Sequence, residues 1–207
     1  MAAYFTLTLD TTAPSGGSIS VISLTNVKTI TATLTATDAT QMFLSGDIEG
    51  GGTWETFATS KSIVLSGSDG TKTIKVKFRD AVGNETAEYT ATTVLDTTGA
   101  VVTVSGVDKN VISKVDGYNV ASFSFSADTE ITAWEVRVVP ATGSVHTAGT
   151  VIGTTNGSEN TSGNTTKAAN TAVTVSINGA DLEAASAGDG AKIIKVFVQD
   201  AAGNWSA

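Results

Sequence analysis

Apolar and polar residues alternate along most of this chain with a period of two. In the segment 27–37, isoleucine, alanine and leucine fall on one face of an extended chain and threonines on the other. The same alternation recurs in four further segments: 74–78, 122–126, 173–177 and 194–198. Successive side chains of a strand point to opposite faces, so the pattern predicts strands packed on one side and hydrated on the other. Clusters of Gly, Asp, Ser and Asn between the segments predict turns. Only residues 181–185 have a helical composition, with Asp181 as the expected N-cap of one or two turns.

The chain contains one unit twice. The sequence Leu-Asp-Thr-Thr at 9–12 returns at 95–98, 86 positions later, and residues 71–87 match residues 191–207, 120 positions later. The second copy is therefore 34 residues longer between these landmarks, and we place most of the addition in the Gly-, Thr- and Asn-rich stretch 143–170. With about seven short strands in each copy, the pattern predicts an all-β fold of two tandem immunoglobulin-like antiparallel β-sandwiches. Their expected ranges are residues 10–95 and 96–207.

The chain starts one strand out of phase with its own repeat. In the first copy, residues 88–95 form the predicted last strand, whereas the second copy stops three residues after Asn204 and lacks this strand. Residues 3–9 have the composition of such a strand and directly precede the first linker. They are either the remnant of a preceding module or a strand that completes the open sandwich of a neighbouring copy. In the second case the assembly residues are Tyr4, Phe5, Leu7 and Leu9, and head-to-tail contacts would build fibres or closed rings.

Composition excludes several classes of protein. The 207 residues carry a net charge of −8 and include no cysteine and one histidine. An acidic chain is a poor match for the phosphates of nucleic acid. Without cysteine there is no disulfide framework, no thiolate nucleophile and no cysteine-ligated zinc. No apolar run approaches the ~20 residues of a membrane span, so no membrane insertion is expected. No secretory signal is expected either, because the start lacks a basic and an apolar region.

Several segments of the first copy resemble the tandem bacterial immunoglobulin-like domains of cell-surface proteins and phage virion proteins. The resemblance lies in residues 9–14, 41–47, 54–62, 70–73 and 80–84. The second copy, from residues 134–140 through 178–184, is similar to a longer variant associated with phage structural proteins. The resemblance covers nearly the whole chain. It implies the fold more than the function, because such modules serve as spacers, decorations and adhesins.

The resemblance also implies a candidate calcium site. Some immunoglobulin-like surface repeats bind Ca²⁺ at module junctions through acidic residues near these turns. The candidates here are Asp80, Asn84 and Asp96, with Asp10 in the equivalent linker. Calcium takes six to eight oxygen ligands, and capping of the turn explains the aspartates without a metal. No other cofactor is expected.

No pattern for catalysis emerges from the sequence. No pair of acidic residues is singled out as the two carboxylates of a glycosidase. No serine lies in a Gly-x-Ser-x-Gly motif, and His146 is expected to be an exposed loop residue. We therefore predict that the protein is not an enzyme.

The loop 154–164 and the tryptophans are the candidate binding surfaces. Asn156, Asn160 and Asn164 would contact a host-surface glycan from a loop held by a rigid sandwich. A mobile, hydrated insertion is the alternative. Trp54 and Trp205 would stack on a sugar only if their rings are exposed. We expect Trp134 in the core, where an immunoglobulin-like sandwich places its tryptophan, with Trp54 in the matching place of the first copy.

Together these observations predict a structural protein exposed on the surface of a phage virion. It would decorate the capsid or form a fibre-like appendage, as a homo-oligomer or with other virion proteins, and assist attachment to the host surface. The alternative is a set of spacer or adhesive repeats from an extracellular bacterial cell-surface protein. A carbohydrate-binding module is the third hypothesis.

Overall fold

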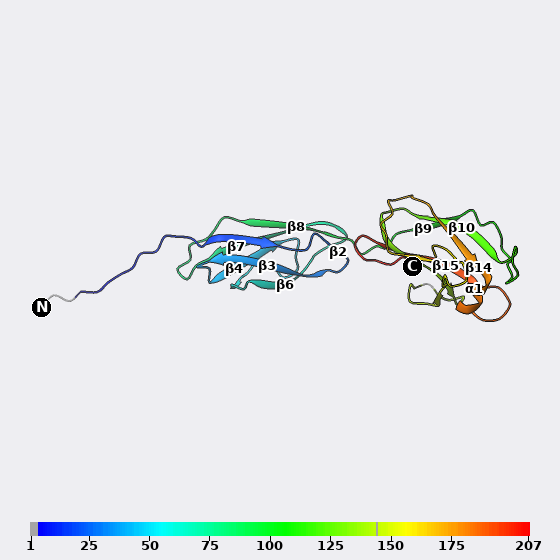
Figure 1. Cartoon of the computed structure of the whole chain (residues 1–207). Coiled ribbons are helices and arrows are strands. Elements are labelled where there is room, and N and C mark those ends of the chain that lie inside the picture. The colour runs from blue at the N-terminus through cyan, green and yellow to red at the C-terminus, as the bar shows by residue number, and fades with distance from the viewer. Residues whose placement is uncertain (1–3, 144) are drawn as a thin grey trace. The chain divides into compact units, whose positions relative to one another are not determined.

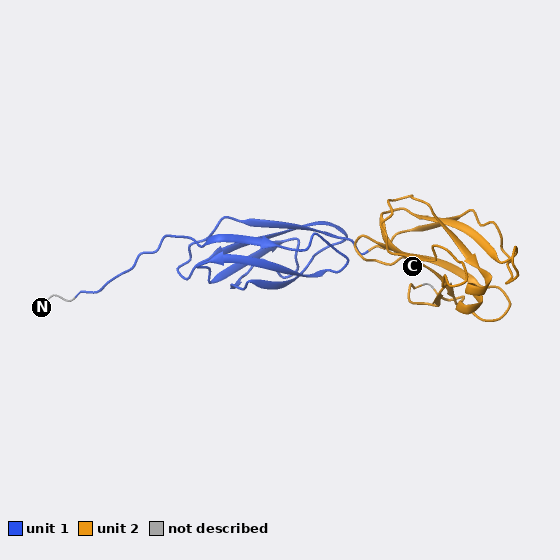
Figure 2. Ribbon diagram, in the orientation of Figure 1, with its two compact units in different colours: residues 1–97 blue, residues 98–207 orange. Residues whose placement is uncertain are grey.

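The computed structural model describes residues 4–143 and 145–207 (Figure 1). The fold is nearly all β, with 46% of residues in strands and 3% in helix, and none of its sheets is closed. The chain divides into two compact units, residues 1–97 and 98–207 (Figure 2). Each unit has two sheets that face each other across a core of its own.

Unit 1 contains eight strands in two sheets (Figure 1). The first sheet has the order β1-β3-β6 and the second the order β2-β8-β7-β4-β5. Their bounds are β1 (Ser15–Ser20), β2 (Leu24–Thr25), β3 (Thr29–Thr37), β4 (Gln41–Gly46), β5 (Trp54–Thr56), β6 (Ser60–Val64), β7 (Gly70–Arg79) and β8 (Tyr89–Leu95). All pairs are antiparallel except β2 with β8.

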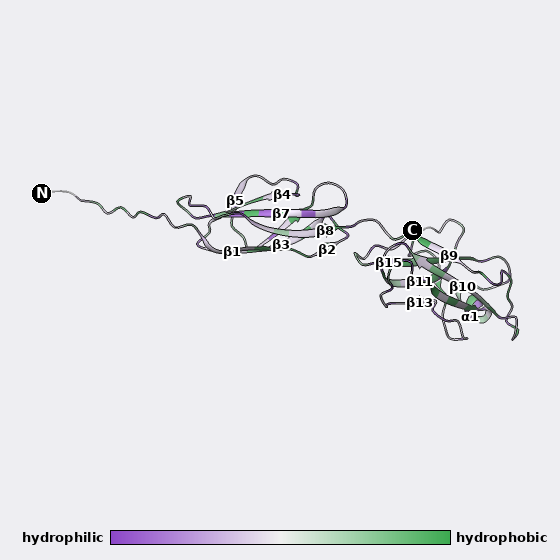
Figure 3. Cartoon of the chain, turned by 90° about the horizontal axis from the view of Figure 1, so that it is seen from above, coloured by the Kyte–Doolittle hydropathy of each residue, from purple (hydrophilic) through white to green (hydrophobic). Residues whose placement is uncertain are grey.

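The core of unit 1 follows from the alternation of its strands. In β3, Ile30, Ala32 and Leu34 are buried and the threonines between them are exposed. In β7, isoleucine, valine and phenylalanine point inward between lysines, which gives this strand its alternating colours in Figure 3. Each fully buried side chain of this size contributes about 1.5–3 kcal/mol to folding through the hydrophobic effect. The predicted in–out pattern of these strands is confirmed.

Unit 2 has seven strands and one short helix. One sheet has the order β14-β10-β9, and in the other β11 pairs with β15 along one edge and with β12 and β13 along the opposite edge. The bounds are β9 (Val102–Ser105), β10 (Val120–Ala127), β11 (Ile131–Val139), β12 (Thr150–Val151), β13 (Ser162–Gly163), β14 (Val173–Asn178), α1 (Gly179–Ala185) and β15 (Ile193–Asp200).

Helix α1 lies where the sequence predicted one, but its cap is a different residue. The side chain of Asn178 accepts a hydrogen bond from the N–H of Ala180 at 2.8 Å and is the N-cap. Asp181 lies inside the first turn, so its prediction as the cap is wrong. In the part of the chain that the structure describes, no helix is long and apolar enough to cross a membrane.

The two units differ at the outer edge of one sheet. In unit 1, β7 lies between β4 and β8. In unit 2, β15 takes the place of β7 and pairs with β11, the counterpart of β4. Among residues 98–143 and 145–207, no strand pairs with the other edge of β15. The position that β8 occupies in unit 1 is therefore open in unit 2.

Candidate functional site

An aspartate closes the turn after β7. The Oδ1 atom of Asp80 accepts hydrogen bonds from the backbone N–H groups of Val82, Gly83 and Asn84 at 3.0, 2.7 and 2.9 Å. Its Oδ2 atom accepts from Asn84 Nδ2 at 2.7 Å. Burial raises the pKa of the Asp80 carboxyl, but the hydrogen bonds from the Asn84 side chain and the three amides outweigh it and hold the pKa below its ordinary value. Both oxygens of this carboxylate therefore accept hydrogen bonds from groups of the turn.

The turn after β15 has the same construction. Asp200 accepts from the N–H of Asn204 at 2.8 Å and from its side-chain Nδ2 at 3.0 Å. Two residues further along, the Ser206 hydroxyl accepts from the N–H of Val198 at 3.0 Å. In unit 1 the corresponding hydroxyl accepts from the N–H of Phe78 at 3.1 Å. The hydrogen bonds of the turn are thus repeated in both copies, and in each copy the aspartate side chain accepts hydrogen bonds from backbone N–H groups of the turn.

The predicted calcium ligands do not come together. Asn84 Nδ2 donates to the backbone carbonyl of Asp10 at 3.3 Å, so the first linker lies beside the Asp80 turn. Asp96 follows β8, whose last residue pairs with the first residue of β7, whereas Asp80 follows the last residue of β7. Ten strand residues separate these two ends by about 30 Å. The prediction that Asp80, Asn84 and Asp96 converge is wrong, and no three His, Cys, Asp or Glu side chains of the described residues are grouped as a metal site.

The 143–170 insertion packs along the edge of β11. Its short strands β12 and β13 both pair with β11, and Ile152 between them is 1% exposed in the core of unit 2. In unit 1, β5 covers the matching edge of β4. The insertion therefore protects a sheet edge, while most residues of 154–164 are exposed to solvent.

Two of the three predicted binding asparagines hold this insertion in place. Asn156 donates to Asp181 Oδ1 from its backbone N and its Nδ2, at 2.9 and 2.8 Å. Asn160 donates from Nδ2 to the carbonyl of Thr174 at 2.7 Å. The side chains of Asn156 and Asn160 are therefore engaged within the unit, although both residues, like Asn164, are exposed to solvent.

Asp181 is a structural residue whose role the sequence did not reveal. It is 2% exposed, and its Oδ2 atom accepts from the N–H of Ser158 at 3.0 Å, in addition to the two bonds from Asn156. Burial raises the pKa of this carboxyl, but the hydrogen bonds from Ser158 and Asn156 outweigh burial and lower the pKa. An acid in a short helix gives no sign that it binds a loop 25 positions earlier in the chain.

One face of the Trp205 ring is covered and not open to a sugar. Its ring stacks on the imidazole of His146, with centroids 3.5 Å apart and an interplanar angle of 8°. His146 Nε2 lies 2.9 Å from Glu135 Oε2, which also accepts from Arg137 Nε at 2.7 Å. All four side chains are partly buried. His146 is therefore not the exposed loop histidine that was predicted, and it covers one face of Trp205.

The other two tryptophans are also engaged. Trp134 is 4% exposed, packs beside Phe125 and donates from Nε1 to a backbone carbonyl, so its predicted place in the core is confirmed. Trp54 is partly buried, with the guanidinium of Arg79 4.3 Å from its ring centroid and Phe43 at 5.5 Å. Trp134 and Trp54 therefore do not form a pair of aromatic rings open to a flat sugar ring.

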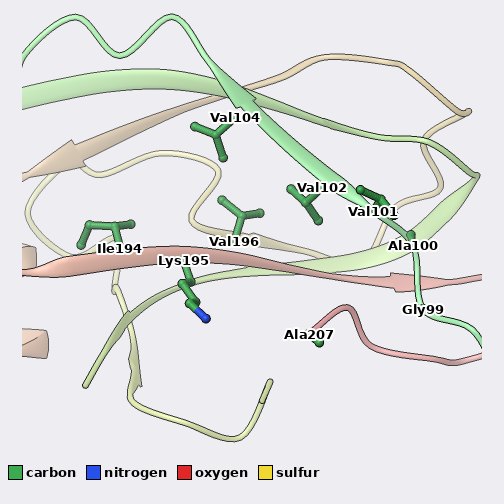
Figure 4. Close-up of a pocket in the computed structure, with 9 residues that line it drawn as sticks. All are labelled: Gly99, Ala100, Val101, Val102, Val104, Ile194, Lys195, Val196 and Ala207. Carbon is green, nitrogen blue, oxygen red and sulfur yellow. The ribbon is translucent and has the colours of Figure 1, made fainter. Parts of the chain in front are cut away.

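An apolar groove of about 450 Å³ lies in unit 2 between β9 and β15. Figure 4 shows the valine and isoleucine side chains of the two strands turned toward one another, with the Lys195 side chain turned away. The lining residues are Gly99, Ala100, Val101, Val102, Val104, Ile194, Lys195, Val196 and Ala207. The predicted assembly residues lie in unit 1, where Tyr4 is 93% exposed and Phe5, Leu7 and Leu9 are each 86% exposed.

No family model and no curated protein matches this chain. Among solved structures, one similar chain comes from a 1.5-MDa bacterial ice-binding adhesin, at 23% identity and a TM-score of 0.39, over 91% of this chain and 60% of that one. Another is chitinase ChiA74 from Bacillus thuringiensis, at 15% identity and a TM-score of 0.30, over 87% of this chain and 29% of that one. This chain spans less than two thirds of either protein chain. At these scores the similarity assigns neither an activity nor a partner.

Proposed function

We propose that this chain is a non-enzymatic structural protein displayed on the surface of a phage particle. The observation that carries the structural, non-enzymatic role is that the candidate chemical groups contact other groups of the chain. Asp80 and Asp181 bind backbone amides, and the one histidine is stacked on Trp205 beside Glu135. These groups stabilise two sandwiches instead of facing a substrate.

The order of the strands supports an immunoglobulin-like sandwich in each unit. In unit 1 the first, third and sixth strands form one sheet, and the fourth, seventh and eighth are neighbours in the other. The chain thus crosses between the facing sheets from β3 to β4 and from β6 to β7, as it does between sheets in the immunoglobulin fold. Such modules place a rigid, hydrated surface at a fixed spacing, which suits a decoration or an appendage.

The phage setting rests on the resemblance of both copies to virion modules. Threonines line the outer face of β3, and the net charge of −8 keeps such a surface soluble. In this proposal the turns need no calcium, because both oxygens of the Asp80 carboxylate already accept hydrogen bonds from amide groups. Contact with a host glycan is a further part of the proposal, and its candidate residues are Asn156, Asn160 and Asn164, which are all exposed.

Immunogold electron microscopy tests the location. Antibodies raised against the purified chain are applied to phage particles and to cells of the source. Gold at a regular position on particles is the expected result, and mass spectrometry of gradient-purified particles should recover the chain at a fixed stoichiometry. Gold on the cell wall without labelled particles would support a bacterial surface protein instead. Gold confined to the cytoplasm of uninfected cells would contradict both.

A further inference from the structure

The groove in unit 2 can be compared with the same place in unit 1. Ile74 and Val76 of β7 are fully buried, because β8 lies beside them. Their counterparts Ile194 and Val196 of β15 are only partly buried and line the groove. The two units share the same inward-facing positions on this strand, so the difference in exposure marks the place of a strand that unit 2 does not receive from its described residues.

The opposite wall of the groove is also apolar and incompletely covered. Val102 and Val104 of β9 pair directly with Ala127 and Phe125 of β10, which are buried in the core. Residues directly opposite in an antiparallel pair point to the same face, so both valines point inward. Val104 is nevertheless 49% exposed. An inward-facing valine with this much exposed surface occupies a core position where a packing neighbour is missing.

Residues 4–9 have the side-chain pattern that this place requires. The repeat sets Phe5, Leu7 and Leu9 at the positions of Ala91, Thr93 and Leu95 in β8. In unit 1, Thr93 and Leu95 are 1% and 0% exposed, and Val94 between them is 39% exposed. Residues 4–9 belong to no strand of the structure, and their apolar side chains face solvent. In the same frame Thr6 and Thr8 take outward positions, as does Tyr4.

We propose that the groove between β9 and β15 is a strand-accepting site and that its occupant is residues 4–9 of a second copy of this chain. The donated strand pairs with the free edge of β15 and buries Phe5, Leu7 and Leu9 against the valines. The pairing of β8 with β7 gives the register: Leu9 opposite Gly190, Leu7 opposite Lys192 and Phe5 opposite Ile194. Backbone hydrogen bonds supply affinity, and the alternating pockets supply specificity.

The anchoring of the donor segment favours a second copy as its source. Asn84 holds the carbonyl of Asp10 at 3.3 Å, so residues 4–9 leave unit 1 beside the Asp80 turn. The chain passes on to unit 2 after β8, at the other end of β7, about 30 Å along that strand. Six extended residues span at most about 21 Å. Donation from one copy to the next uses different surfaces on donor and acceptor, so it builds an open or ring-closed assembly.

Two single substitutions in the tail test the site in solution. Leu7→Asp places a charge on the inward face, and Thr8→Asp places the same charge on the outward face. We expect light scattering to show concentration-dependent oligomers for the unchanged chain and for Thr8→Asp, and a 20.9-kDa monomer for Leu7→Asp. Circular dichroism should show folded β units in all three proteins, since residues 4–9 form no strand in the single chain. A monomer for the unchanged chain, or an oligomer that survives Leu7→Asp, would overturn the proposal.

Disulfide trapping tests the register and the identity of the donor. The chain has no cysteine, and the proposed pairing sets Thr6 opposite Ile193 on the outward face, at a separation that a disulfide can bridge. Thr6→Cys with Ile193→Cys should give a ladder of cross-linked chains on a non-reducing gel. Thr8→Cys with Lys195→Cys is the control, because these positions are four residues out of register. A bond within one chain, without a ladder, would refute the second copy as donor.

The strand-accepting site rests on the proposed structural role and identifies a second copy of the chain as the partner. The experiments can contradict the site and the display on a phage independently. An absence of gold from particles would overturn the display on a phage and leave the strand-accepting site in place. A chain that stays monomeric and forms no cross-linked ladder would overturn the site and leave the display on a phage in place.

Discussion

At the scale of single residues, the acidic groups of this chain act as acceptors for backbone amides. Asp181 is the most buried example, and it joins helix α1 to the insertion through Asn156 and Ser158. Replacement of Asp181 by Asn keeps the shape but turns one acceptor into a donor, which faces the N–H groups of its partners. We expect a loss of about 1–3 kcal/mol in the free energy of unfolding of unit 2.

Urea denaturation followed by tryptophan fluorescence measures this loss. Asp189→Asn is the matched control, because it removes the same charge from an exposed turn position and should change the stability by less than about 0.5 kcal/mol. Equal stability of the two variants would contradict the role assigned to Asp181.

The lowered pKa values of Asp80 and Asp181 make stability depend on pH in one direction. A folded-state pKa below the unfolded value of about 3.9 means that the unfolded chain binds more protons in this range. The contribution of these aspartates is complete above about pH 5 and is lost as the pH falls through the folded pKa values. We expect a steady fall of the urea midpoint from pH 5 to pH 2.5, and a shallower fall for unit 2 in Asp181→Asn. A midpoint that rises on acidification would refute this assignment.

The sequence predicts the aspartates of the turns better than those of the insertion. Asp80 and Asp200 stand in a short pattern with a glycine and an asparagine, so local geometry defines their partners. Asp181 and His146 contact residues 25 and 11 positions away, and only the folded chain brings them together. The same limit explains the calcium prediction, which placed Asp96 beside Asp80 without knowing the strand between them.

At the scale of elements, the insertion contributes to the core of unit 2 through one side chain. Ile152 is 1% exposed and lies between β12 and β13. Ile152→Ala leaves a cavity and should lower the free energy of unfolding of unit 2 by about 2–5 kcal/mol. Val111→Ala is the control, since Val111 is 79% exposed. Amide hydrogen exchange should show lost protection in β12 and β13, and unchanged protection there would contradict the packed state of the insertion.

Two glycines of the insertion offer a second test of its packing. A Cβ at Gly163 in β13 would meet the Trp134 ring at 2.2 Å, whereas a Cβ at Gly153 would meet nothing within 4 Å. Gly163→Ala therefore forces the buried tryptophan or the strand to move, at about 1–3 kcal/mol. Gly153→Ala should be close to neutral. Thermal melts and the Trp134 emission maximum check the pair, and a neutral Gly163→Ala would show that β13 does not lie against this ring.

Long strands were predictable from the sequence and the shortest ones were not. β3, β7 and β10 carry several periods of alternation, which identify both the strand and its buried face. β12 and β13 have two residues each, too few to show a period. Their place depends on the free edge of β11, a tertiary feature, and this is why the sequence left the insertion between a binding loop and a mobile one.

At the scale of the whole molecule, the repeat produces two cores that share no residue. Leu34 is 0% exposed in the core of unit 1, and Phe125 is 1% exposed in the core of unit 2. Leu34→Ala should cost about 2–5 kcal/mol and Phe125→Ala about 3–5 kcal/mol, each in its own unit. Calorimetry should resolve two transitions, of which each variant shifts one. Hydrogen exchange assigns the transitions, with residues 4–97 losing protection first in Leu34→Ala and residues 98–207 in Phe125→Ala.

The Leu7→Asp tail variant is the control for assembly, because a filled groove would raise the stability of unit 2 by mass action. If either core variant shifts both transitions equally in that monomeric background, the two units fold as one cooperative body.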